Sequence, residues 1–171
     1  ARLAMLMQFT MPGVPLVYYG EEIGMEGGAD PDCRRPMRWN AADWNTIQRD
    51  WVKRLIAMRK ANAALQYGDV TVLGDRLPHS NALVFLRHTE VPGEAALVVI
   101  NLADEPLDIL LLLPYSHWYD GVPLRDALGA APDTKVQAAS VRLNLAPHSG
   151  AVYQAVEPYQ HYTFFKARNR I

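Results

Sequence analysis

The chain has 171 residues, half of them hydrophobic, with 17 basic and 18 acidic side chains and a formal net charge of −1. This composition indicates a globular protein of one or two domains, and it argues against a disordered chain and against nucleic acid or a membrane surface as partner. The single cysteine, Cys33, excludes an internal disulfide and favours a reducing, cytoplasmic location.

The chain opens with a predicted helix over residues 1–10, which Pro12 and Gly13 bring to an end. An apolar run without polar gaps follows, made up of Val14, Leu16, Val17, Tyr18 and Tyr19. Such a run is typical of a parallel strand buried on both faces. The residues after it would then lie at the carboxyl end of a strand, where barrel enzymes build their sites. A doubly wound sheet would use the same strand, so this run alone leaves the fold open.

A second helix is predicted to begin after Asn45 and to run to about Asn62, because Asn45 and Gln48 have the spacing of a capping box. Its expected buried stripe is Ile47, Trp51, Leu55 and Met58. Its expected solvent-facing residues are Gln48, Arg49, Lys53 and Arg59.

The pattern changes to short strands after Tyr67 and Gly68. Strands are predicted around residues 70–72 and over 82–88, 95–102, 107–112, 136–145 and 150–156, with turn residues between several of them. Short strands at this spacing predict an antiparallel sandwich.

Two stretches resemble a known family. "GVPLVYYGEEIGM" (13–25) is similar to the eighth barrel strand of the alpha-amylase family of glycoside hydrolases and its exit, and "DPDCRRPMRW" (30–39) resembles a loop of its neopullulanase, cyclomaltodextrinase and maltogenic amylase branch. The resemblance continues to about residue 155. It implies an α+β chain in which residues 1–66 form the last strand–helix unit of a (β/α)8 barrel. Residues 67–157 would then form an all-β antiparallel C-terminal sandwich domain, and the tail 158–171 matches nothing expected of the family.

No catalytic residue is expected in this chain. Glycoside hydrolysis needs two carboxyl groups that flank the scissile bond, whereas Glu21 and Glu22 are neighbours that point to opposite sides of an extended backbone. The resemblance implies that the family's catalytic carboxylates come from earlier barrel strands. The chain alone is therefore expected to be inactive.

The resemblance implies that Asp30 and Arg34 bind sugar hydroxyls in an intact parent enzyme. A carboxylate accepts hydrogen bonds from hydroxyls and a guanidinium donates them, so the chemistry suits this role. The alternative is an ion pair that only fixes the loop. Structural roles at the barrel end are expected for Tyr19, Glu22, Asp32 and Arg35. Arg35-Pro36 stands where the branch often has Lys-Cys, a departure within this loop.

No metal or cofactor is expected, because the five histidines have no ligand spacing. Trp39 and Trp44 are expected to pack the loop rather than to stack on sugars.

The predicted function is that of the C-terminal part of a glycosidase acting on α-1,4- and α-1,6-linked glucans such as starch, maltodextrin, cyclodextrin or pullulan. The alternative is a stand-alone carbohydrate-binding or interaction module. An unpaired strand near Leu16 predicts a homodimer, unless the tail 158–171 covers it.

Overall fold

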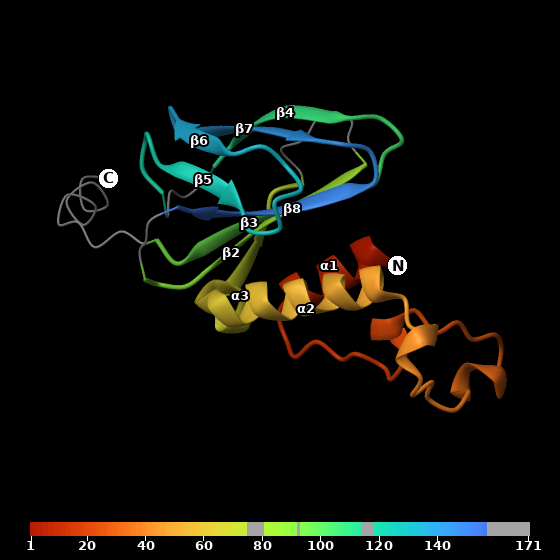
Figure 1. The fold of residues 1–171 in the computed structure, drawn as a ribbon. Coiled ribbons are helices and arrows are strands. Elements are labelled where there is room, and N and C mark those ends of the chain that lie inside the picture. The colour runs from red at the N-terminus through yellow and green to blue at the C-terminus, as the bar shows by residue number, and fades with distance from the viewer. Residues whose placement is uncertain (75–80, 92, 114–117, 157–171) are drawn as a thin grey trace.

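The computed structural model describes residues 1–74, 81–91, 93–113 and 118–156. Within these ranges the helices are α1 (Arg2–Thr10), α2 (Thr46–Ala61) and α3 (Ala63–Tyr67). The strands are β1 (Asp69–Val72), β2 (Ala82–His88), β3 (Ala95–Asn101), β4 (Leu107–Leu112), β5 (Pro123–Asp126), β6 (Thr134–Gln137), β7 (Ser140–Leu145) and β8 (Ser149–Ala155) (Figure 1).

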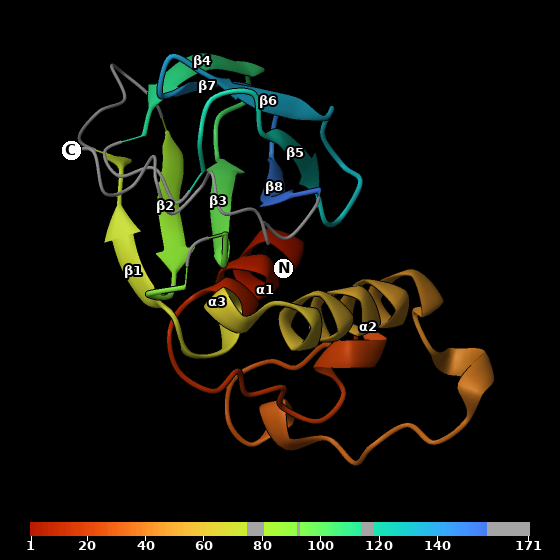
Figure 2. The ribbon, with the colours of Figure 1, turned by 90° about the vertical axis from the view of Figure 1, so that its left-hand side faces the viewer.

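All strand pairs described are antiparallel, and the strands form one sheet in the order β1-β2-β3-β8-β5-β6-β7-β4. The sheet curls over on itself, so that β4 and β7 lie across from β2 and β3 (Figures 1 and 2). Alternate residues of the two halves, such as Val99 and Leu143, meet in a shared apolar core. The predicted antiparallel β region is thus confirmed, in the form of a curled sheet. The assignment of residues 1–66 to a barrel and of 67–157 to a separate domain stays a prediction.

The strand predicted over residues 136–145 is wrong, because β6 and β7 form a tight hairpin there. Ala138 and Ala139 connect the two strands, with φ angles of 47° and 55°. Positive φ at both central residues is the signature of a hairpin turn that normally uses Asn and Gly. Because the two turn residues are alanines, the sequence has no local signal for this turn. The short strand β5 was not predicted either.

Helices α1 and α2 cover the outer face of the sheet, and with α3 we call them the helical layer (Figures 1 and 2). Leu6 and Leu55 share a second apolar core with Val98 on β3 and Val152 on β8. Strand β3 is therefore buried along its whole length. Gly150 permits the close approach of α1, because a Cβ there would lie 2.4 Å from Leu6 Cδ2.

The predicted buried stripe of α2 is only partly right. Leu55 and Met58 are buried, but Ile47 is exposed, and Gln48 and Arg59 are buried although solvent exposure was expected. The buried face is rotated toward positions 48, 52, 55 and 59 because both a helix and a sheet pack against α2. The predicted N-cap is present: Asn45 Oδ1 accepts from the Gln48 backbone N–H at 3.0 Å.

The buried strand expected between Val14 and Tyr19 is also wrong for this structure. The segment is extended, but it pairs with no strand in the described ranges, and Val14 is 95% and Leu16 72% exposed. A strand needs a neighbour to complete its hydrogen bonds, and this segment has isolated contacts instead: Gln8 Nε2 donates to the Leu16 carbonyl at 2.6 Å, and the Glu21 backbone N–H donates to the Tyr18 carbonyl at 3.0 Å. Val14 and Leu16 therefore lie open on the surface, whereas Val17 packs against the second apolar core.

Candidate functional site

The candidate site lies on the loop of residues 20–44, which we call the site loop. The loop contains three short 3-10 helices, at Glu21–Ile23, Asp32–Arg34 and Ala41–Asp43. Gly20 starts the loop with a φ of 91°, a conformation that favours glycine. Ile23 is buried, and its carbonyl accepts from the Asn45 backbone N–H at 3.0 Å. The loop is thus tied to the start of α2 as well as to the segment before it.

Glu22 and Tyr19 both bond to backbone groups near the start of the loop. Glu22 Oε2 accepts from the Gly20 backbone N–H at 2.8 Å. The Tyr19 hydroxyl donates to the Arg35 carbonyl at 3.0 Å and so connects the beginning of the loop to its middle. The rings of Tyr18 and Tyr19 lie 4.6 Å apart. Glu22 and Tyr19 therefore both bond to the backbone of the loop and stabilise its conformation.

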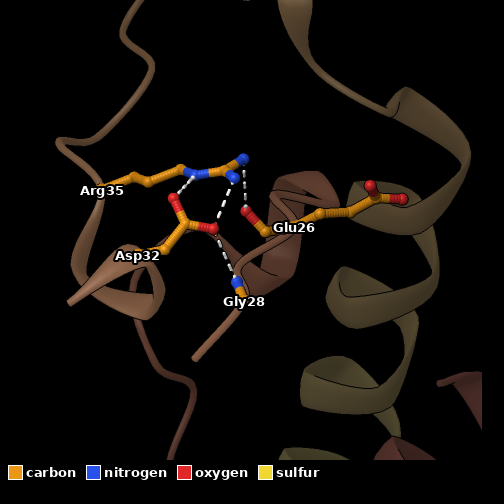
Figure 3. Close-up of polar contacts among 4 residues, drawn as sticks. All are labelled: Glu26, Gly28, Asp32 and Arg35. Atoms are coloured by element: carbon orange, nitrogen blue, oxygen red, sulfur yellow. Dashed lines mark hydrogen bonds and ion pairs between the residues drawn. The ribbon is translucent and has the colours of Figure 1, made fainter. Parts of the chain in front are cut away.

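Asp32 and Arg35 form a two-oxygen ion pair that holds the loop together (Figure 3). Arg35 donates from Nε to Oδ1 and from Nη2 to Oδ2 of Asp32, each at 2.6 Å. Asp32 also accepts from the Gly28 backbone N–H at 2.9 Å, and Arg35 Nη1 donates to the Glu26 carbonyl at 3.2 Å (Figure 3). The guanidinium, followed by the Gly28 amide, lowers the pKa of Asp32, and the carboxylate raises the pKa of Arg35.

Asp30 and Arg34 form a different kind of pair. Both Nε and Nη2 of Arg34 donate to the same oxygen, Oδ1 of Asp30, with the Nε contact at 2.9 Å. Within the described residues, Oδ2 of Asp30 accepts no hydrogen bond and Nη1 of Arg34 donates none. Both side chains are exposed. The pair therefore presents a spare acceptor beside a spare donor, as recognition of neighbouring hydroxyl groups requires.

The two tryptophans of the loop differ. Trp44 Nε1 donates to the Arg38 carbonyl at 2.8 Å, and the Arg49 guanidinium lies 4.9 Å from the Trp44 ring centroid. Trp44 thus packs the loop as predicted. Trp39 is 81% exposed, so the packing expected for it is not seen among the described residues.

Within the described ranges, no group of three or more His, Cys, Asp or Glu side chains is placed to hold a metal ion. No helix of that part of the chain is long and apolar enough to cross a membrane.

Sequence reasoning missed three buried charged residues outside the loop. Arg59 and Arg87 are buried and donate to backbone carbonyls near the end of α1. Asp126 is buried at the end of β5, where it accepts from the backbone N–H groups of Leu128, Ala130, Ala131 and Val152. The only sequence signal for Arg87 is a charge inside the apolar run of β2.

Comparisons with known proteins agree with the resemblance seen in the sequence. Residues 1–73 match the family model for the alpha amylase catalytic domain. The chain is 36% identical over 155 residues to neopullulanase 2 of Thermoactinomyces vulgaris, a match that covers 88% of this chain and 25% of that protein. It is 39% identical over 100 residues to a cyclomaltodextrinase of Thermoanaerobacter pseudethanolicus, which covers 58% of this chain and 17% of that protein.

Solved structures give the same result. The alpha-amylase of Geobacillus thermoleovorans complexed with acarbose matches with a TM-score of 0.76 and 28% identity, over 92% of this chain and 33% of that one. An alpha-amylase from Anoxybacillus matches with a TM-score of 0.75 and 25% identity, over 91% and 32%. The chain thus spans a third or less of the length of each of these relatives.

Proposed function

We propose that this chain, a relative of the alpha-amylase family of glycoside hydrolases, supplies the end of the barrel and the following β domain of an enzyme that acts on α-glucans. The substrates would be α-1,4- and α-1,6-linked glucans of the starch, maltodextrin, cyclodextrin or pullulan type. Proteins similar to this chain are named neopullulanase, cyclomaltodextrinase and amylopullulanase, which supports this substrate class.

The observation that carries the proposal is the continuity of the match. The similarity to neopullulanase 2 covers 88% of the chain, so it includes the site loop as well as much of the curled sheet. Since the first 73 residues match a catalytic domain, the site loop belongs to the part of the relatives that carries out catalysis. A pure carbohydrate-binding module would share the sheet without needing this loop.

Within the site loop, we assign substrate contact to Asp30 and Arg34 and a supporting role to Asp32 and Arg35. The reason is the difference between the two ion pairs. Asp32 uses both carboxylate oxygens inside the loop, whereas the exposed Asp30–Arg34 pair keeps one oxygen and one nitrogen for a ligand. A sugar with two neighbouring hydroxyls would accept from Arg34 Nη1 and donate to Asp30 Oδ2.

These residues do not supply the reaction itself. A pair of carboxyl groups about 5 Å apart is needed for a retaining mechanism, with one of them protonated. Asp30 and Asp32 are each neutralised by an arginine, and Glu22 accepts from a backbone amide. We therefore propose that this chain binds the glucan at one end of a cleft. The catalytic carboxylates of that cleft would come from another part of the parent enzyme. A cytoplasmic location stays a prediction from the single cysteine.

The alternative, a stand-alone carbohydrate-binding or interaction module, is less well supported. The helical layer shares an apolar core with the outer face of β3, so this face of the sheet is buried by the helices. The sheet therefore does not have the form of an independent module. The exposed apolar segment at Val14 and Leu16 also fits a chain that packs against further structure.

A chimera tests the proposal. The stretch of Thermoactinomyces vulgaris neopullulanase 2 that aligns with this chain is replaced by the chain itself, and hydrolysis of pullulan is measured by reducing ends. Retained hydrolysis is the expected result. A folded chimera, shown by an unchanged circular dichroism spectrum, that has lost pullulan hydrolysis would contradict the proposal.

A further inference from the structure

Two buried arginines connect the helical layer to the sheet. Arg59 lies on α2 and is 8% exposed, and Arg87 lies on β2 and is 0% exposed. Arg87 is two positions from Phe85, which packs in the core beneath the helices, so Arg87 also faces the helical layer. Neither side chain forms an ion pair with a carboxylate of the described residues. Burial of a guanidinium without such a partner is costly, so its hydrogen bonds have to be well placed.

Both guanidiniums converge on one stretch of backbone, residues 9–13. Arg59 Nη1 donates to the carbonyls of Phe9 at 2.8 Å and Met11 at 3.2 Å, and its Nη2 donates to that of Gly13. Arg87 Nη1 donates to the Thr10 carbonyl. The last carbonyls of a helix have no partner within it, and a positive charge there is favourable. Together the two arginines thus complete the end of α1 and the turn that leads into the segment 14–19.

The same two side chains also hold the connection between the helices and the sheet. Arg87 donates from Nη2 to the Gly68 carbonyl at 2.6 Å and from Nε to the Asp69 carbonyl at 3.2 Å. Arg59 Nη2 lies 3.4 Å from the Gln66 carbonyl. Gly68 itself is closely enclosed, because a Cβ there would lie 2.6 Å from the carbonyl oxygens of Ala64 and His88. The connection therefore has little room to act as a hinge.

We propose that Arg59 and Arg87 form a clamp that makes the helical layer and the curled sheet one cooperative unit and fixes the backbone where the segment 14–19 begins. The clamp itself rests only on contacts within this chain.

Native-state hydrogen exchange of the full chain in rising urea tests the clamp, because it separates global from local opening. In the unaltered chain, peptides from residues 46–61 and 95–101 are expected to lose protection at the same urea concentration. In Arg87→Met, which keeps bulk but loses every donor, exchange in 46–61 is expected to rise by about tenfold or more, with a much smaller change in 95–101. Arg87→Lys keeps the charge, so the difference in exchange between peptides 46–61 and 95–101 is expected to be smaller than in Arg87→Met.

Two comparisons keep this test decisive. Arg142→Met on β7 removes an exposed pair with Asp108 on β4 and is expected to leave both peptides unchanged. The double variant Arg59→Met/Arg87→Met is expected to lose less than the sum of the single effects, because both arginines hold residues 9–13. The clamp is refuted if the unaltered chain opens its helices before its sheet, a result that needs no variant to fold. Equal acceleration of both peptides in Arg87→Met would also refute it.

Discussion

Asp32 Oδ2 accepts from Arg35 Nη2 at 2.6 Å and from the Gly28 backbone N–H at 2.9 Å, so one carboxylate oxygen joins two parts of the site loop. Asp30 lies only two positions away and has no such backbone contact among the described residues. Asp32 is therefore bonded to the loop backbone, whereas Asp30 is bonded only to side chains among the described residues, and we expect the two to respond differently to mutation.

The first prediction concerns the pH dependence of the loop. Because the folded pKa of Asp32 is lowered, its pairing stabilises the loop fully above the unfolded value of about 4 and is lost as pH falls through the lower folded pKa. NMR titration of the Gly28 amide is expected to show a midpoint below the usual range for aspartate. Arg35→Gln is expected to raise that midpoint, and Arg34→Gln is the matched control that leaves it in place. A midpoint at the ordinary aspartate value in the unaltered chain would contradict the assignment.

The second prediction concerns Arg34 as a substrate contact. In the neopullulanase chimera, Arg34→Ala is expected to weaken glucan binding by about 10- to 100-fold, the usual effect of losing a charged hydrogen bond. Thermal stability is expected to change little, because the pair is exposed. Binding constants for maltooligosaccharides, measured by calorimetry, check this. Asp50→Ala is a suitable control, since it removes a surface carboxylate paired with Lys53 on α2; equal affinities for all three proteins would refute the role of Arg34.

The third prediction is that the 171-residue chain alone does not hydrolyse α-glucans. The reason is that Asp30 and Asp32 are each paired with an arginine and Glu22 accepts from a backbone amide, while the transition state needs a facing acid and nucleophile. The purified chain is incubated with pullulan, cyclodextrins and maltotriose, and reducing ends are measured. Release clearly above a buffer blank that survives repurification would disprove the prediction.

The fourth prediction concerns the hairpin between β6 and β7. Replacing Ala138-Ala139 by Asn-Gly is expected to raise the free energy of unfolding by about 1 kcal/mol, because both positions have positive φ and alanine is unfavourable there. Urea unfolding measures the change. Ala130→Gly, at a position without positive φ, is the control and is expected to destabilise. If the Asn-Gly variant proves less stable than the parent, the turn geometry is wrong.

This hairpin also shows where sequence reasoning reached its limit. The bounds of β2 and β4 and the cap at Asn45 were predictable, since alternating apolar residues and a side-chain cap are local signals. The turn at Ala138 was not, because its conformation is set by pairing of the flanking strands rather than by its residue types.

The buried arginines show the same limit at longer range. Arg59 has the helical position of a solvent-facing residue, and its burial follows from carbonyls that are 46 to 50 positions earlier in the chain. At the site, the residue types at positions 30–35 predicted ion pairs, but not which carboxylate would keep a free oxygen. Those features depend on contacts that no local pattern encodes.

The last prediction is that this 171-residue chain self-associates. The exposed segment holds Val14 and Leu16, and its backbone pairs with no strand in the part of the chain that the structure describes. Unpaired amides beside apolar side chains favour pairing with a second chain, and a two-fold arrangement is the commonest closed solution. Light scattering across a wide dilution range is expected to show a dimer at high concentration.

Substitutions on the same segment make the test specific. Leu16→Lys places a charge on the unpaired segment and is expected to favour the monomer. Val72→Lys is the matched control, because it changes another exposed apolar residue, on the edge strand β1. A constant monomer mass at every concentration, with Leu16 amides protected from exchange, would mean that another part of the same chain covers the segment, the tail 158–171 outside the described residues included. Loss of the dimer in both variants alike would show that the contact is not made by the segment 14–19.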